Sequence, residues 1–253
     1  MTSLTITESG SGPAVLVLHG GAGPFSVAGI AEHFARTSRV LTPTLPGWNG
    51  TTRPDEIDTI ADLAAAYLIL LRERELREVL VIGSSVGGWI AAEMAAQDRA
   101  GTVGGVVLID ATGVWIDAAP IPDFFALDAR AIAEYSYHDP DRFYQDPSEI
   151  PAAQLAVRQA NMVALRHFAG EPYMHDPTLL PRLADVTIPT LLVWGESDRI
   201  VTPAYGAAYA AAFGNAKLEI ISEAGHLPHM EQPETTFAIL DAYASQVSGT
   251  PAR

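Results

Sequence analysis

Short apolar runs recur along the chain, and most of them end in a loop that contains glycine or polar residues. Continuous apolar runs are typical of strands that are buried on both faces of a parallel sheet. An alternating apolar and polar pattern at residues 4–7 instead predicts a short edge strand. The other predicted strands cover residues 14–18, 40–45, 79–82, 103–109, 190–194 and 217–221.

Segments with helical character separate these strands. A helix is predicted from Ser26 to about residue 36, and another over 59–76 with Asp58 as its cap. Thr202 and Pro203 predict a capped helix start. Further helices are predicted over 87–98 and 233–244, and a frayed tail over 247–253. Because strands and helices alternate, the pattern predicts an α/β fold with a mainly parallel central sheet flanked by helices.

The pattern changes between residues 111 and 186. This stretch holds many prolines and aromatic residues and no strong strand, with helical patches at 126–135 and 152–167. We therefore predict a core made of residues 1–110 and 187–253, with 111–186 inserted as a helical cap. The chain contains no internal repeat or low-complexity segment.

The charge balance narrows the range of partners. The chain has 253 residues, 30 acidic against 15 basic, and a formal net charge of −15. Such a charge repels nucleic-acid phosphates and anionic lipid, so we expect neither nucleic acid nor a membrane surface as a partner. We expect a small-molecule substrate, and a homodimer is left open. With 0 cysteines, disulfides, thiolate metal sites and cysteine nucleophiles are excluded.

Targeting signals are not evident in the sequence. The N-terminal residues lack the basic and apolar segments of a signal peptide. The apolar run at 61–71 is too short for a membrane span and leads into charged residues. We expect a soluble, cytoplasmic protein.

The stretch around Ser85 is the strongest chemical signal. Ser85 lies in a G-x-S-x-G motif, between a predicted strand and a predicted helix. Gly83 and Gly87 lack Cβ atoms, so the chain can turn sharply there and expose the serine hydroxyl at the carboxyl edge of the sheet. The first N–H groups of the helix then point toward the same place, which suits a nucleophile whose attack creates an oxyanion.

A serine nucleophile needs a base, and the base needs an acid to orient it. His226 follows the predicted strand at 217–221, in a loop with flanking glycine and proline. Asp198 follows the strand at 190–194. We predict Ser85, His226 and Asp198 as the catalytic residues, since all three follow carboxyl ends of predicted strands. Asp110 also follows a strand and is the alternative acid.

The oxyanion needs two donors. We predict the backbone N–H groups of Gly21 and Val86, because His19-Gly20-Gly21 follows an early strand and Val86 follows the nucleophile. His19 itself is interpreted as a buried scaffold histidine. Among the aromatic residues in or near the predicted cap, we expect four to line a substrate pocket: Trp48, Trp115, Phe124 and Phe125.

Two weaker patterns do not predict cofactors. Residues 21–26 faintly match a dinucleotide fingerprint, but the third glycine is missing and no acidic residue ends the next strand. His226, His229 and Glu231 are spaced like metal ligands, but Pro228 prevents a regular helix there. We expect no metal and no cofactor.

Together these motifs resemble the α/β-hydrolase fold over nearly the whole chain. The similar stretches are His-Gly-Gly-x-Gly-Pro at 19–24, Pro46-Gly47, the Ser85 motif, Trp194-Gly195-x-x-Asp198, and the motif from Gly225 to Pro233. The order serine, aspartate, histidine also matches this fold. The resemblance implies an eight-stranded, mostly parallel sheet with a helical cap after strand six, although the short N-terminal hairpin suggests one edge strand fewer.

The resemblance implies a serine hydrolase that cleaves small, largely apolar esters, thioesters or lactones through an acyl-enzyme. Serine at 85 argues against the dehalogenase and epoxide hydrolase branches, which use aspartate. The loop at 19–24 resembles carbon–carbon bond hydrolases of ring-cleavage products, which usually carry an aromatic residue where this chain has Leu227. That activity is the first alternative. A non-catalytic ligand-binding homologue is the second.

Overall fold

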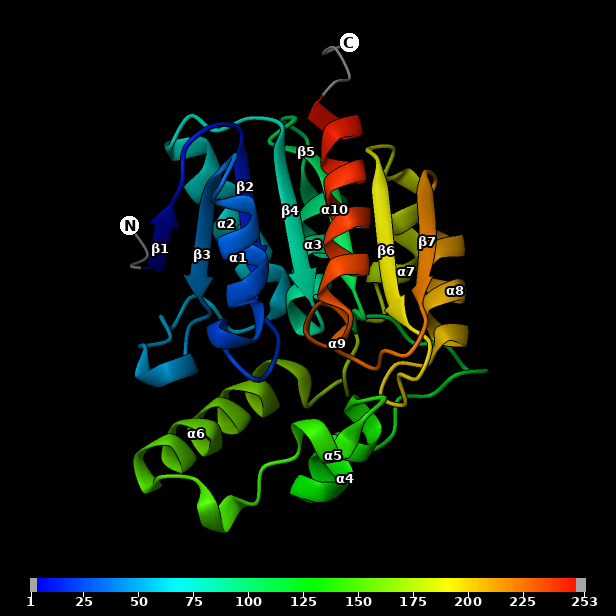
Figure 1. Ribbon diagram of the computed structural model, residues 1–253. Helices are drawn as coiled ribbons and strands as arrows, with labels where there is room; N and C mark the ends of the chain where they lie inside the picture. Colours follow the sequence, from blue (N-terminus) through cyan, green and yellow to red (C-terminus); the bar gives the residue numbers. More distant parts are fainter. Residues whose placement is uncertain (1–3, 249–253) are drawn as a thin grey trace.

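A computed structural model describes residues 4–248 of the chain (Figure 1). Within these residues, seven strands form one sheet in the order β1-β3-β2-β4-β5-β6-β7. The antiparallel pair β1–β3 forms one end of the sheet, and all other neighbours are parallel. The strands are β1 (Thr5–Ser9), β2 (Ala14–Leu18), β3 (Arg39–Thr44), β4 (Val79–Ser84), β5 (Val103–Ile109), β6 (Thr190–Gly195) and β7 (Ala216–Ile221).

Helices cover both faces of the sheet, which explains the continuous apolar strands. Alternate side chains of one strand point to opposite faces. Val15 and Val17 of β2 therefore pack with α1 (Ala28–Phe34) and α10 (Pro233–Ser248). Leu16 and Leu18 pack in the core on the other face. That face is covered by α2 (Ile60–Glu73), α3 (Val86–Gln97) and α8 (Pro203–Ala212) (Figure 1).

Residues 111–186 connect β5 to β6 without adding a strand to the sheet. In Figure 1, α4, α5 and α6 lie beyond the carboxyl ends of the strands, whereas α7 packs beside α3 and α8. An ion pair between the buried Glu93 of α3 and the partly exposed Arg182 of α7 joins α7 to α3, at 2.8 Å. The helical elements of this segment are η3 (Phe124–Ala126), α4 (Ala129–Ser136), α5 (Pro140–Phe143), η4 (Pro147–Glu149), α6 (Ala152–Ala169), α7 (Leu179–Arg182) and η5 (Leu183–Asp185).

Several predicted details are confirmed and others are corrected. Within residues 4–248 the sheet has seven strands, one fewer than the family's eight, as the short N-terminal hairpin suggested. Thr202 caps α8 with Pro203 in its first turn, as predicted. Thr59, not Asp58, caps α2, because the Thr59 hydroxyl accepts from Asp62 N–H while the Asp62 carboxylate accepts from Thr59 N–H.

The helix predicted from Ser26 begins instead as a 3₁₀ turn, η1 (Pro24–Val27), and continues as α1. The predicted frayed tail overlaps the end of α10, and residues 249–253 of that tail lie outside the described residues. Among the described residues, no helix combines the length and apolar character that a membrane crossing would need.

Candidate active site

Ser85 occupies a sharp corner between β4 and α3. Its φ and ψ are 55° and −119°, which a non-glycine residue rarely adopts. The corner is fixed by hydrogen bonds on both sides: Ser85 N–H donates to Ile109 O at 2.9 Å, and Ser85 O accepts from Gly88 N–H at 2.9 Å. The strain is therefore held by β5 and by the first turn of α3.

The two glycines of the motif permit this corner. A Cβ atom on Gly83 would lie 2.1 Å from Gly87 O, and one on Gly87 would lie 2.2 Å from Leu18 O. Both contacts are with backbone atoms, which cannot move aside without shifting α3 or β2. The sequence signal at Gly83 and Gly87 therefore has a direct steric cause.

His226 and Asp198 meet Ser85 at the carboxyl edge of the sheet. The Ser85 hydroxyl lies 3.0 Å from His226 Nε2, and His226 Nδ1–H donates to Asp198 Oδ2 at 2.7 Å. A carboxylate only accepts hydrogen bonds, so the Nδ1 proton leaves Nε2 free to take a proton from Ser85. The three loops, far apart in sequence, thus form one continuous hydrogen-bonded chain.

Backbone donors hold the Asp198 carboxylate in place. Asp198 Oδ1 accepts from Ile200 N–H at 2.7 Å and from Val201 N–H at 3.1 Å. The side chain has 0% exposed surface, so water does not compete for these bonds. Such a carboxylate is suited to orienting an imidazole and stabilising its protonated form.

The loop that carries His226 is attached to the 111–186 segment. His226 N–H donates to Ser136 O at 2.6 Å. The buried Glu231 carboxylate accepts from Gly225 N–H at 2.6 Å and from His138 N–H at 3.0 Å. The end of α4 therefore helps to set the position of the imidazole.

The glycine loop after β2 approaches the nucleophile closely. A Cβ atom on Gly20 would lie 2.9 Å from Ser85 Cβ and 3.5 Å from Ser85 Oγ. Within residues 4–248, neither Gly21 N–H nor Val86 N–H donates a hydrogen bond to a protein group. Both therefore stay available as the predicted oxyanion donors.

His19 has the environment of a scaffold residue. It is fully buried, its Nδ1–H donates to Gly20 O at 2.7 Å, and its Nε2 accepts from Leu45 N–H at 3.0 Å. Burial lowers the pKa of His19 to about 4, so the ring is neutral near pH 7. It joins the glycine loop to the end of β3.

Trp48, predicted to line the pocket, is packed inside the protein. It has 0% exposed surface, its indole N–H donates to Gly21 O at 2.9 Å, and its ring stacks on Phe168. In this structure Trp48 supports the glycine loop and offers no open surface to a substrate.

The other predicted pocket residues remain accessible. Trp115 is 48% exposed, and its indole N–H donates to Asp117 at 2.6 Å. Phe124 and Phe125 are half-buried and pack edge to face. Whether these rings contact a substrate stays a prediction.

Sequence reasoning did not identify Asn161 of α6. Its buried amide oxygen accepts from Asn49 N–H at 2.8 Å, and its amide nitrogen donates to Ala22 O at 3.2 Å. It thus joins α6 to two loops of the core. The sequence did carry a signal, because Asn161 is a polar residue on the helix face that also carries the apolar residues Ala164, Leu165 and Phe168.

The three residues weighed as metal ligands have separate roles. His229 Nε2–H donates to Ser26 O at 2.7 Å, and burial lowers the pKa of His229 to about 4. Glu231 accepts backbone N–H groups and His226 contacts Ser85 and Asp198. The prediction that Pro228 prevents a helix here is wrong, because Pro228 begins the short helix α9 (Pro228–Glu231). Among the described residues, this set is nevertheless not grouped around a common point.

A different trio does lie close together. Asp110, Asp198 and His226 each have a polar atom within 4.8 Å of the other two, and all three are buried. The His226 Nδ1 and Asp198 Oδ2 atoms are 2.7 Å apart, whereas two ligands of a tetrahedral zinc ion would be separated by about 3.4 Å. The geometry favours proton transfer over metal binding.

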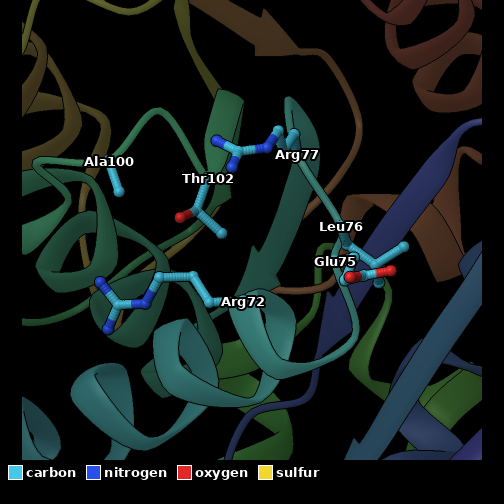
Figure 2. A pocket seen from close by; sticks show the side chains of 6 residues that line it. All are labelled: Arg72, Glu75, Leu76, Arg77, Ala100 and Thr102. Atoms are coloured by element: carbon cyan, nitrogen blue, oxygen red, sulfur yellow. The ribbon is translucent and has the colours of Figure 1, made fainter.

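The cavity in Figure 2 lies at the other end of the strands from Ser85. Arg77 precedes β4 and Thr102 precedes β5, so both mark the amino ends of the strands. Ser85, Asp198 and His226 lie at the carboxyl ends. The cavity is therefore separate from the candidate active site. Its lining residues are Arg72, Glu75, Leu76, Arg77, Ala100 and Thr102.

The fold, and the meeting of Ser85, His226 and Asp198 at the carboxyl ends of its strands, are typical of hydrolases, and comparison with known proteins assigns the family. The model of the alpha/beta hydrolase family matches residues 15–239. The chain therefore belongs to the alpha/beta hydrolase family. Its curated relatives include hydrolases of 2-hydroxy-6-oxo dienoic acids, and solved structures with the same fold include a lactone degrading enzyme and an esterase.

Three similar proteins illustrate this range. A 2-hydroxy-6-oxononadienedioate/2-hydroxy-6-oxononatrienedioate hydrolase of Cupriavidus pinatubonensis is 25% identical over 250 residues, covering 88% of this chain and 84% of the relative. A meta-cleavage product hydrolase of Pseudomonas fluorescens superposes with a TM-score of 0.80 at 16% identity, covering 96% and 94%. Est816, an N-acyl homoserine lactone degrading enzyme, superposes with a TM-score of 0.75 at 21% identity, covering 94% and 96%.

Proposed function

We propose that this hydrolase cleaves a small, neutral, largely apolar carboxylic ester, thioester or lactone through an acyl-enzyme on Ser85. The observation that carries the proposal is the hydrogen-bonded chain from Ser85 Oγ through His226 to Asp198, with distances of 3.0 and 2.7 Å. A serine alcohol is a weak nucleophile until a base removes its proton, and the imidazole is in position to do so.

The reaction proceeds in two halves. As Ser85 Oγ attacks the carbonyl carbon, His226 Nε2 takes the hydroxyl proton and Asp198 stabilises the imidazolium. The Gly21 and Val86 N–H groups donate to the oxyanion, and one such donor contributes about 3 kcal/mol. His226 then protonates the leaving group. Water, deprotonated by His226, attacks the acyl-enzyme, and His226 gives this proton to Ser85 Oγ as the bond between Oγ and the acyl carbon breaks and the acid leaves.

The overall charge of the chain supports a neutral substrate. The chain carries a net charge of −15, which disfavours anionic substrates. Within the described part of the chain, each arginine of 111–186 already contacts a protein group. The contacts are Arg130 with Glu134 and Asp141, Arg142 with Phe143, Arg158 with Gln145, Arg166 with Phe125, and Arg182 with Glu93.

Carbon–carbon bond hydrolysis is the second candidate. The names of curated relatives favour it, since several are hydrolases of 2-hydroxy-6-oxo dienoic acids. Such substrates carry carboxylates, which ordinarily need cationic partners in a binding site. Of the arginines in 111–186, Arg130 and Arg182 are already paired with carboxylates. Leu227 follows His226 where carbon–carbon bond hydrolases usually carry an aromatic residue, so we rank this candidate below ester hydrolysis.

A matched substrate panel tests the proposal. We expect turnover of nitrophenyl acetate, butyrate and octanoate and of a neutral lactone, with kcat/KM at least tenfold above that for a 2-hydroxy-6-oxo dienoate. Ser85→Ala should reduce kcat by about ten-thousandfold. Preference for the dienoate would favour the second candidate.

A fluorophosphonate probe separates both enzymes from a protein that only binds ligands. We expect the probe to label the native chain and not the Ser85→Ala variant. A folded native protein that neither reacts with the probe nor hydrolyses any ester would instead support the non-catalytic homologue.

A further inference from the structure

Asp110 lies beside the Ser85 site without belonging to its chain of hydrogen bonds. It directly follows β5, is fully buried, and has a left-handed φ of 43°. Its N–H donates to Val193 O at 3.0 Å, and its Oδ1 accepts from Gly195 N–H at 2.9 Å. The backbone of β6 therefore hydrogen-bonds to both the backbone and the side chain of Asp110.

The second oxygen of Asp110 is the unusual atom. Asp110 Oδ2 is buried and accepts no hydrogen bond from any described residue. Asp198, by contrast, accepts from Ile200 N–H, Val201 N–H and His226 Nδ1–H. Polar atoms of Asp110, Asp198 and His226 lie within 4.8 Å of one another. A buried, unpartnered carboxylate oxygen beside a second carboxylate is unfavourable if both groups are ionised.

The charges that face Asp110 determine which group holds a proton. Burial is the main cause that raises the pKa of Asp110 well above its usual range, followed by the negative charge of Asp198, and Glu231 adds to the effect. The Gly195 N–H acts in the opposite direction. Asp198 has three donors against one for Asp110, so ionisation is better accommodated on Asp198.

We infer that Asp110 carries a proton on its second oxygen and donates this O–H to the Asp198 carboxylate. The inference rests on the proposed function, in which Asp198 orients His226. Asp110 is then a positioning residue that touches neither the substrate nor Ser85. It supplies Asp198 with one more donor and adds no second negative charge that would compete for the imidazole.

Kinetics of three variants test the inference. Asn tolerates a left-handed backbone and can donate to Asp198 while accepting from Gly195, so Asp110→Asn should keep kcat within about tenfold of the native enzyme. Asp110→Ala removes the donor and should lower kcat by about tenfold to a hundredfold more than Asp110→Asn does, with KM little changed. Asp198→Asn should lower kcat by about a thousandfold or more.

Infrared spectroscopy reads the proton directly. At pH 7, the difference spectrum of native protein minus Asp110→Asn should contain the carbonyl stretch of a protonated carboxylic acid. This measurement needs no turnover and no unstable variant, so it stands even if Ser85→Ala shows the proposed function to be wrong. The inference is overturned if that band is missing, if Asp110→Asn loses as much activity as Asp198→Asn, or if a folded Asp110→Ala matches Asp110→Asn.

Discussion

The Asn161 side chain of α6 accepts a hydrogen bond from Asn49 N–H at 2.8 Å and donates to Ala22 O at 3.2 Å. The first contact reaches the loop after β3, and the second reaches the loop that carries Gly21. One amide of the 111–186 segment therefore ties together the two loops beside the proposed oxyanion donors. The position of α6 and the position of Gly21 are coupled through this side chain.

Replacing Asn161 should slow catalysis. Asn161→Ala leaves Asn49 N–H and Ala22 O without partners, at a cost of about 1–3 kcal/mol. We expect kcat for a nitrophenyl ester to fall by about tenfold to a hundredfold. Val163→Ala, on the exposed side of the same helix, is the matched control and should behave like the native enzyme. An unchanged kcat in Asn161→Ala would contradict the coupling.

Two neighbouring glycines should respond differently to alanine. A Cβ atom on Gly20 would meet the rigid Cβ of Ser85 at 2.9 Å, whereas one on Gly21 would meet the flexible end of Leu165 at 2.8 Å. Gly20→Ala must displace the nucleophile, so we expect kcat to fall at least about tenfold further than in Gly21→Ala. Steady-state kinetics of the two variants give the comparison, and equal losses would argue against this steric account.

Glu231 should act on His226 through the loop between them. Its two oxygens accept from Gly225 N–H and His138 N–H. In Glu231→Gln an amide NH₂ replaces one of these acceptors and faces a donor. We expect kcat to fall by about tenfold or more, with KM changed little. Glu234→Gln, at the exposed start of α10, serves as the control. A change confined to KM would count against this role.

Acid should unfold the protein through two buried histidines. His19 and His229 each have a folded pKa of about 4, below the value of about 6.5 in an unfolded chain. Their contribution to stability is therefore complete above pH 6.5 and is lost as pH falls toward 4, by about 3 kcal/mol each. Asp110 has the opposite effect on the free energy of unfolding: its pKa is raised in the folded state, so its contribution to stability grows as pH falls.

Urea unfolding between pH 6.5 and pH 5 measures this loss. His229→Gln can keep a donor toward Ser26 O but cannot titrate. We expect its free energy of unfolding to depend less steeply on pH than that of the native protein. Identical pH slopes for the two proteins would show that His229 does not bind a proton on unfolding.

Most of the fold could be predicted from the sequence, because strands, helices and turns leave local patterns in it. Apolar runs such as Val79–Ile82 predict buried strands, and the steric need for glycine at positions 83 and 87 marks the turn. The positions of Asp198 and His226 followed from a topological rule, since parallel strands bring their carboxyl ends to one edge. No local pattern could show which of Asp110 and Asp198 faces the imidazole.

Long-range packing limited the remaining predictions. In the sequence, Trp48 is an aromatic residue in a loop, which suggested a pocket residue. In the structure its ring stacks on Phe168 and its indole N–H donates to Gly21 O, and both partners lie far from it in the sequence. Asn161 was missed for the same reason, because its partners Asn49 and Ala22 become neighbours only in the folded protein. The predicted cap of α2 was wrong by one residue. Thr59 is the cap in place of Asp58, because Thr59 and Asp62 exchange hydrogen bonds between side chain and backbone.

The most direct test of the central claim is the site and rate of covalent labelling. After reaction with a fluorophosphonate, peptide mass spectrometry should find one adduct per chain, on Ser85, and His226→Asn should label at least about a hundredfold more slowly. Labelling of a different residue, or an unchanged rate in folded His226→Asn, would contradict an imidazole-activated serine.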